Sequence, residues 1–227
     1  MKVRSKLAGI LAASFLAVVP LGLGLPAATA ATVSSCSMNI PSIVRISTPH
    51  QAVTARLSSD CAAAGAIDAS WDVYHPTQGS GEVLWFLNTS TEIWNVYDGE
   101  ITPAVYTWRP SGAFDSDEKL IDQNTPRTDV RVGSSAAIYT ARTGSYVTIK
   151  TSSGRYAYSL SQWVRWGGTR GTIQYYGSAG WTNLKYAYQD ASGYYTYRFY
   201  APQSRSYRVI FPSAPTIWGS VSGSSYR

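Results

Sequence analysis

The sequence predicts an all-β protein made of two tandem β-sandwich domains. Short runs that alternate apolar and polar residues recur along the chain, and Gly, Pro, Asn, Asp and Ser interrupt them roughly every 8 to 12 positions. Neither half shows an apolar stripe with the period of about 3.6 residues that marks a surface helix. About seven short strands per 100 residues are typical of a β-sandwich.

The first 30 residues predict a secretory signal peptide. Lys2, Arg4 and Lys6 form a positive start, residues 7–25 are almost entirely apolar, and Ala28-Thr29-Ala30 supplies small residues for cleavage after Ala30. A retained membrane anchor fits less well, because Gly and Ser dilute the apolar run. We therefore expect a secreted, extracellular protein.

The composition of the remaining chain favours a folded domain pair and excludes several classes. Removing residues 1–30 from 227 leaves 197, which suits two domains of about 100 residues each. No later apolar run approaches the ~20 residues that a membrane helix needs. With 2 Cys and 2 His, the chain cannot build a metal site from several Cys and His, nor a disulfide-dense miniprotein.

The balance of charged residues and the frequency of tyrosine both change near residue 128. Residues 31–128 hold 5 Lys/Arg and 11 Asp/Glu, whereas residues 129–227 hold 11 and 2. Three tyrosines precede this division and 14 follow it. The polar, Pro-containing segment 122–128 is typical of a domain boundary. We therefore predict an N-terminal domain over 31–127 and a C-terminal domain over 128–227.

Strands are predicted wherever β-branched or aromatic residues cluster between turn signals. In the first half they cover 43–46, 52–57, 69–74, 82–87, 92–97 and 104–108. In the second half they cover 129–132, 136–140, 146–150, 172–176, 181–185, 194–199 and 207–211. The aromatic run from Trp85 to Trp94 is interpreted as a core hairpin that turns at residues 88–90.

The two cysteines predict one disulfide, between Cys36 and Cys61. An exported chain with two cysteines is most simply explained by one bond in an oxidising compartment. Val33-Ser34-Ser35-Cys36 also loosely matches the box before a lipidated cysteine. That alternative is disfavoured, because about ten small and polar residues separate the box from the apolar run, and lipidation would leave Cys61 without a partner.

Catalytic chemistry is not predicted, so we expect no enzyme. A hydrolase triad needs a histidine base, and the two available, His50 and His75, each stand beside a proline in sequence typical of a loop or strand end. No Gly-x-Ser-x-Gly turn surrounds a serine. Paired carboxylates for a glycosidase would have to come from Glu82, Glu92, Asp98 or Glu100, and nothing in the sequence brings two of them together.

One acidic loop is a candidate metal site. Asp115, Asp117 and Glu118 form the densest group of carboxylates, and alternate carboxylates in a loop suit calcium. The EF-hand pattern is absent, and a solvated acidic loop is the simpler interpretation. Calcium is the only cofactor that the sequence suggests.

The second half predicts a basic face rich in aromatic side chains. Of eight tryptophans, six are expected inside, and Trp166 and Trp181 are expected outside because each adjoins a Gly-containing turn. In the pairs Tyr175-Tyr176 and Tyr194-Tyr195 one ring must point outward, since neighbours on a strand face opposite sides. The candidate binding residues are Trp166, Trp181, Tyr176, Tyr195, Arg165 and Arg170.

Several landmarks in residues 128–227 resemble the C-terminal Ig-like module of small exported proteins from actinomycetes. They are Trp163-Val-Arg-Trp166, Gln174-Tyr175, Gly180-Trp181-x-x-Leu184, Asp190-Ala-Ser-Gly193, Tyr195 and Arg205-Ser-Tyr207-Arg208-Val209. Some of those proteins bear a calcium-binding label. The resemblance implies an Ig-like β-sandwich and a binding or structural role, and it transfers no catalytic residue.

These observations predict a secreted, non-enzymatic binding or structural protein. Its basic, tyrosine-rich face would contact an extracellular polysaccharide, cell-wall polymer or protein. Nucleic acid is not expected as a partner, because no recognition motif accompanies the charge. The alternatives are a small exported hydrolase that acts on glycan or protein, and an exported protease inhibitor.

Overall fold

The computed structural model describes residues 35–227, and its chain is all-β apart from one short helix and one 3-10 turn. The predicted signal peptide lies outside these residues. Within them, no helix is long and apolar enough to cross a membrane. The predicted all-β class is therefore confirmed.

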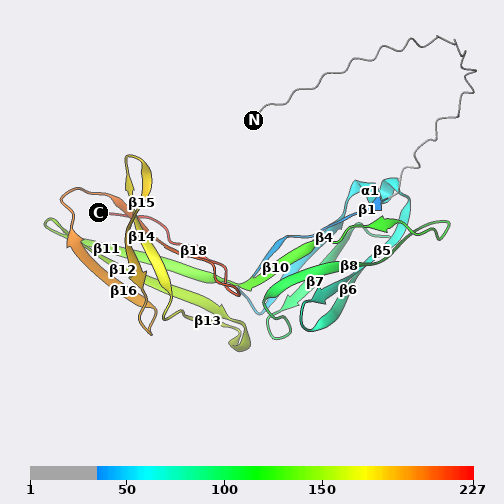
Figure 1. Ribbon diagram of the computed structural model, residues 1–227, viewed down its shortest axis with the longest axis horizontal. Coiled ribbons are helices and arrows are strands. Elements are labelled where there is room, and N and C mark those ends of the chain that lie inside the picture. The colour runs from blue at the N-terminus through cyan, green and yellow to red at the C-terminus, as the bar shows by residue number, and fades with distance from the viewer. Residues whose placement is uncertain (1–34) are drawn as a thin grey trace, which may run out of the picture. The chain divides into compact units, whose positions relative to one another are not determined.

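The strands before Gly133 form three sheets (Figure 1). Five strands pair in the order β3 (Ile43–Ile46), β10 (Arg127–Val132), β8 (Ala104–Asp115), β5 (Ala66–His75) and β6 (Gly79–Leu87). Three pair in the order β2 (Met38–Asn39), β4 (His50–Leu57) and β7 (Thr91–Tyr97). A two-stranded sheet joins β1 (Ser35–Cys36) to β9 (Asp122–Gln123), and helix α1 spans Ser59–Ala63.

The strands after Gly133 form two sheets. One contains β11 (Ser134–Thr143), β12 (Tyr146–Ala157), β13 (Gln162–Arg165) and β16 (Tyr194–Tyr200), with the 3-10 turn η1 (Tyr158–Leu160) between β12 and β13. The other contains β15 (Gly180–Tyr188), β14 (Arg170–Gly177), β17 (Ser206–Phe211), β18 (Ser220–Val221) and β19 (Ser225–Tyr226).

Alternation along the strands builds the first core. In β5, Ala69, Trp71 and Val73 are buried while their neighbours are partly exposed. Trp94 packs edge-on against Trp108, with ring centroids 5.1 Å apart. Strands of the five-stranded and three-stranded sheets thus contribute rings to one cluster of buried residues, as in a sandwich.

The second core is smaller and brings its two sheets close together. Val147 and Ile149 of β12 pack with Ile173 of β14 and Phe211 of β17. Gly171 lies so near the Phe211 ring that an added Cβ would stand 2.6 Å from it. This position of β14 therefore requires glycine, and the aromatic ring fills the space that a side chain would occupy.

Strand pairing shows that the predicted Trp85–Trp94 hairpin is wrong. β6 pairs with β5, and β7 pairs with β4. Residues 88–90 carry the chain from one sheet to the other. Each of the two strands buries alternate side chains in the shared core, so their apolar pattern is the same as that of a hairpin.

The segment proposed as a domain boundary leads directly into a strand of the first half. β10 pairs in parallel with β3 and antiparallel with β8. Pairing among the first-half strands therefore continues to Val132, and Gly133 separates it from β11. The division into two domains remains a proposal. The strand-pairing partners change at Gly133.

Several side chains connect the two groups of strands. Tyr156 of β12 donates a 2.6 Å hydrogen bond from its hydroxyl to Asp98, and both residues are buried. The indole N–H of Trp163 donates to the Ser47 carbonyl at 3.2 Å, and that of Trp218 donates to the Val44 carbonyl at 3.0 Å. The two groups therefore share one buried hydrogen bond and two more exposed ones, as well as a continuous chain.

Replacing Tyr156 with Phe is expected to destabilise the fold. The buried Asp98 carboxylate would lose its donor, and hydrogen bonds to charged groups contribute about 1.5–3 kcal/mol. Urea denaturation at pH 7 measures the loss. Tyr158→Phe, on a neighbouring and partly exposed ring, is the matched control and should change stability little.

The same pair predicts a dependence on alkaline pH. Burial, together with the hydrogen bond to Asp98 and the charge of that carboxylate, raises the pKa of Tyr156 to about 12 from the usual 10.0. This contribution to stability is fully present below about pH 10 and is lost as the pH rises toward 12. The stability of the native protein should thus fall more steeply over that window than that of Tyr156→Phe. Equal slopes would contradict the assignment.

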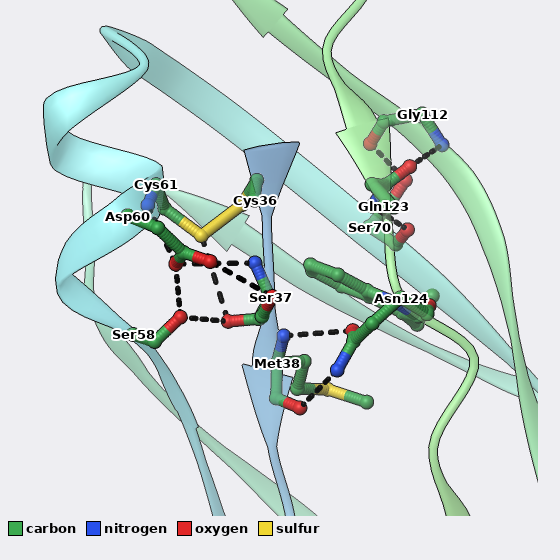
Figure 2. The surroundings of a disulfide bond; sticks show 11 residues. Cys36, Ser37, Met38, Ser58, Asp60, Cys61, Ser70, Gly112, Gln123 and Asn124 are labelled. Atoms are coloured by element: carbon green, nitrogen blue, oxygen red, sulfur yellow. Dashed lines mark hydrogen bonds between the residues drawn. A yellow bond between two sulfur atoms is a disulfide. The ribbon is translucent and has the colours of Figure 1, made fainter. Parts of the chain in front are cut away.

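The predicted disulfide is confirmed, and it anchors the start of the described chain (Figure 2). Cys36 in β1 is bonded to Cys61 in α1. Beside it, Asp60 accepts hydrogen bonds from the Ser37 hydroxyl at 2.8 Å, the Cys61 N–H at 2.9 Å and the Ser58 hydroxyl. The bond from Ser58 is the main cause that lowers the pKa of Asp60, and burial partly opposes it.

Candidate functional site

The outward side of the β15-β14-β17 sheet gathers aromatic, guanidinium and amide side chains. In β14, Gly171 and Ile173 point into the core, so the alternate positions face outward. We call this surface the β14 face. It consists of Arg170, Thr172, Gln174 and Tyr176 of β14, Trp181, Asn183, Tyr186 and Tyr188 of β15, and Arg208 of β17.

A β-bulge makes this composition possible. Thr172 pairs with Tyr186, but after the bulge Gln174 pairs with Asn183, so one residue of β15 is inserted. The inserted stretch includes Leu184, whose side chain packs against the second core. Along β15 the outward positions therefore change from odd numbers to even, so Trp181 and Asn183 share a face with Tyr186 and Tyr188.

A chain of contacts fixes the polar groups at one end of the β14 face. The Arg208 guanidinium lies 4.2 Å from the Trp181 ring centroid. Its Nε donates to the Gln174 side-chain oxygen at 2.8 Å, and the Gln174 amide N–H donates to the Asn183 oxygen at 2.8 Å. Because each group is held by the next, the row is arranged before any ligand arrives.

Aromatic rings flank this row. Tyr176 packs edge-on against Trp181 with centroids 5.3 Å apart, and the Arg170 guanidinium lies 4.9 Å from the Tyr186 ring centroid. A shallow depression of about 350 Å³ runs between Arg170, Gln174, Asn183 and Tyr186. Tyr176, Tyr186 and Tyr188 are each more than half exposed. Such a surface can stack on a flat ring and bind oxygen atoms beside it.

The structure brings three of the six predicted binding residues together. Trp181, Tyr176 and Arg170 all lie on the β14 face. Gln174, Asn183 and Tyr186 belong to it but were not predicted. Period-two spacing would have found Gln174, whereas Asn183 and Tyr186 fall on opposite sides of the bulge, and nothing in the sequence locates the bulge.

The other three lie elsewhere. Arg165 is on the outer side of the β12 sheet, where its guanidinium and the Lys150 ammonium lie 4.6 and 4.7 Å from the Tyr194 ring centroid. Tyr195 packs against the second core. The sequence predicts an exposed Trp166, but its ring is partly buried against Phe211, at a centroid distance of 6.3 Å. The Trp166 ring contacts both cores and therefore lies where they adjoin.

The most exposed tryptophans differ from the predicted pair. Trp85 is 62% exposed and Trp163 is 47% exposed. Trp85 stands on the outer side of the edge strand β6, between buried Leu84 and Phe86. The sequence correctly placed Trp85 in a strand, but which side of the sheet its ring faces depends on the register between β6 and β5.

The two histidines have structural partners. His50 stacks on Tyr97 at 4.7 Å and hydrogen-bonds Asn95 at 3.0 Å. His75 is buried, and its Nδ1 accepts N–H bonds from Thr77 and Gln78 at 3.2 and 3.1 Å. In residues 35–227, neither ring is hydrogen-bonded to a serine or a carboxylate.

The acidic loop is a self-contained turn. Asp115 accepts N–H bonds from Asp117 and Lys119 at 3.0 and 2.9 Å, and Glu118 adopts a left-handed backbone. Within the described chain, no group of three or more His, Cys, Asp or Glu residues is placed to hold a metal. Calcium binding by Asp115, Asp117 and Glu118 stays a prediction.

Comparisons with known proteins give distant structural similarity. No family model and no curated protein matches the chain. It is similar to the human OSCAR ligand-binding domain, with 14% identity and a TM-score of 0.30 over 85% of this chain and 98% of that one. It is also similar to fibronectin(III)-like modules of Clostridium thermocellum CbhA, with 11% identity and a TM-score of 0.33 over 83% of this chain and 90% of that one.

A third similar structure is a tetra-tandem repeat in the extending region of a large adhesion protein. Identity is 8% and the TM-score 0.32 over 85% of this chain. The chain spans 48% of that structure. At such identities and TM-scores, none of the three supplies a ligand or an activity for this protein.

Proposed function

We propose that this protein is a secreted, non-enzymatic binding protein whose β14 face binds an anionic extracellular polysaccharide or cell-wall polymer. The observation that carries the proposal is the ordered row of Trp181, Arg208, Gln174 and Asn183 beside exposed tyrosines. The Cys36–Cys61 disulfide fits an oxidising, extracellular compartment.

The chemistry of the row suits a charged sugar polymer. Aromatic rings stack on sugar rings while their polar edges stay hydrated. A guanidinium binds carboxylate or phosphate oxygens with two parallel N–H bonds, and amides bind hydroxyl groups. In the β14 face all three kinds of group lie side by side and already contact each other, so little side-chain freedom would be lost on binding.

The charge of the surrounding domain supports an anionic ligand. Residues 134–227 contain ten Lys or Arg and one acidic residue, Asp190. The Asp190 carboxylate accepts the Tyr194 N–H at 2.9 Å within its own turn. The β14 face itself includes no carboxylate. A polyanion would therefore be attracted to the domain and would meet no repelling charge on this face.

Paired arginine variants test the proposal. Arg208→Ala and Arg198→Ala each remove one positive charge and one cation–π contact, but Arg198 lies on the other sheet, 4.9 Å from the Tyr146 ring centroid. Binding to polygalacturonate and to purified teichoic acid would be measured by calorimetry at 0.3 M salt, where exposed charges are strongly screened. We expect Arg208→Ala to weaken binding at least tenfold and Arg198→Ala less than threefold.

Tyrosine variants separate stacking from charge. Tyr176→Ala on the β14 face should weaken binding, whereas Tyr200→Ala, on a slightly more exposed ring of β16, should not. Melting temperatures of all variants should stay near that of the parent protein. Equal losses for both members of each pair, or binding that disappears at 0.3 M salt, would show a basic surface without a specific site.

A further inference from the structure

The first half contains a cavity that is separate from the β14 face. It has a volume of about 330 Å³ and lies between β6 and β7, the last strands of the two facing sheets. Its lining comes from the start of β6 and the end of β7, so it opens at the end opposite the 88–90 connection. Small-molecule sites in proteins begin at about this size.

The inner wall of the cavity is aromatic. His75, Trp94 and Tyr106 line it, and each is at least nine-tenths buried. The Tyr106 ring centroid is 5.1 Å from that of His75 and 5.7 Å from that of Trp94, so the rings hold one another in place. Tyr97, which also lines the cavity, is 45% exposed and is supported from behind by His50.

Two carboxylates, Glu82 and Glu100, line the same cavity. Burial is the main cause that raises the pKa of Glu82, and repulsion by Glu100 adds to it. Among residues 35–227 the one ion pair joins Arg131 to Asp129, so neither glutamate has a cationic partner there. Two neighbouring carboxylates beside aromatic rings, without an ion-pair partner in the described chain, favour a cationic ligand.

His75 lines the cavity and has a buried nitrogen without a hydrogen-bond partner in the described chain. Its Nδ1 accepts the two backbone N–H bonds of the Thr77–Gln78 turn, so a neutral ring has its proton on Nε2. That Nε2 is buried and has no partner in the described part of the chain, although His75 is only 6% exposed. Buried donors are nearly always paired, and a bound group is one usual reason when they are not.

We propose that this cavity binds a small organic ammonium group, such as the head of an amino alcohol. The aromatic wall would attract the cation through its ring faces, and Glu82 and Glu100 would neutralise its charge at the entrance. A hard metal ion suits the site poorly, because it needs six to eight oxygen ligands and the wall consists of rings.

Choline and its uncharged carbon isostere, 3,3-dimethylbutan-1-ol, test the proposal with the full exported protein. Binding would be followed by calorimetry at constant ionic strength and by the shift of the Trp94 indole N–H in NMR spectra. We expect choline to bind at least tenfold more tightly than the isostere. The double variant Glu82→Gln/Glu100→Gln should lose at least tenfold in choline affinity, whereas Glu92→Gln, on β7 and outside the cavity, should lose none.

Three results would overturn the proposal. Hydrophobic contact alone would bind choline and the isostere equally, so equal affinity for both probes would show that charge plays no part. Unchanged choline binding in the double variant, or an equal loss in Glu92→Gln, would place the site elsewhere. Displacement of choline by calcium chloride would identify a metal site. Glu100 is exposed and Glu82 is only partly shielded from solvent, so the variants should keep the parent melting temperature. A β14-face ligand should bind these variants unchanged.

Discussion

Replacing Trp108 with Ala is expected to lower the free energy of unfolding by about 3–5 kcal/mol, the usual cost of truncating a buried aromatic ring. Trp108 is fully buried, packs edge-on against Trp94 and donates its indole N–H to Thr128 at 3.0 Å. A domain of this size has a total stability of about 5–15 kcal/mol. The variant should therefore lose a large fraction of its stability.

Guanidinium denaturation of two further variants isolates the cause. Trp108→Phe keeps most of the ring contact and loses the hydrogen bond, so it should cost about 1–2 kcal/mol. Trp85→Ala removes a ring that is 62% exposed from the same sheet and should change stability by less than about 0.5 kcal/mol. If Trp85→Ala and Trp108→Ala cost the same, the assigned facing sides of β6 and β8 would be incorrect.

Strand positions could be predicted from the sequence because they depend on local pattern. All thirteen predicted strand segments fall within strands of the structure, and several continue beyond the predicted ends. β8 is the clearest case, since it continues past 108 through Pro110 and Gly112 to Asp115. A bulge where β8 pairs with β5 near Ser70 accommodates these residues, so turn-forming residues did not end the strand.

Pairing partners could not be predicted, because they depend on contacts distant in sequence. The run from Trp85 to Trp94 fits a hairpin and a change of sheet equally well, and only the partners β5 and β4 distinguish them. The candidate site has the same limit. Trp181 was predicted from the adjoining Gly-containing turn and Tyr176 from strand alternation in the pair Tyr175-Tyr176. Tyr186 joins them only because the bulge near Leu184 reverses the facing side of β15.

Breaking the Cys36–Cys61 bond is expected to lower the free energy of unfolding by about 3 kcal/mol on the chain-entropy account. The bond closes a sequence separation of 25. Hydrogen bonds hold the same segment in place without it. Asn124 bonds the Met38 N–H and carbonyl at 2.9 and 3.0 Å, and Asp60 accepts the Ser37 hydroxyl. The folded state should thus change little, and the loss should arise in the unfolded chain.

The variant Cys36→Ala/Cys61→Ala tests this without leaving buried hydroxyl groups, since both cysteines are almost fully buried. Its urea denaturation should match that of the reduced native protein, and reductant should not affect it. Adding Asn124→Ala separates the two contributions. If the disulfide acts on the unfolded chain, Asn124→Ala should cost the same with and without the bond. If the bond mainly holds the first strand against α1 in the folded state, the cost should be much larger in the alanine background, because the hydrogen bonds of Asn124 and Asp60 would then carry that attachment alone.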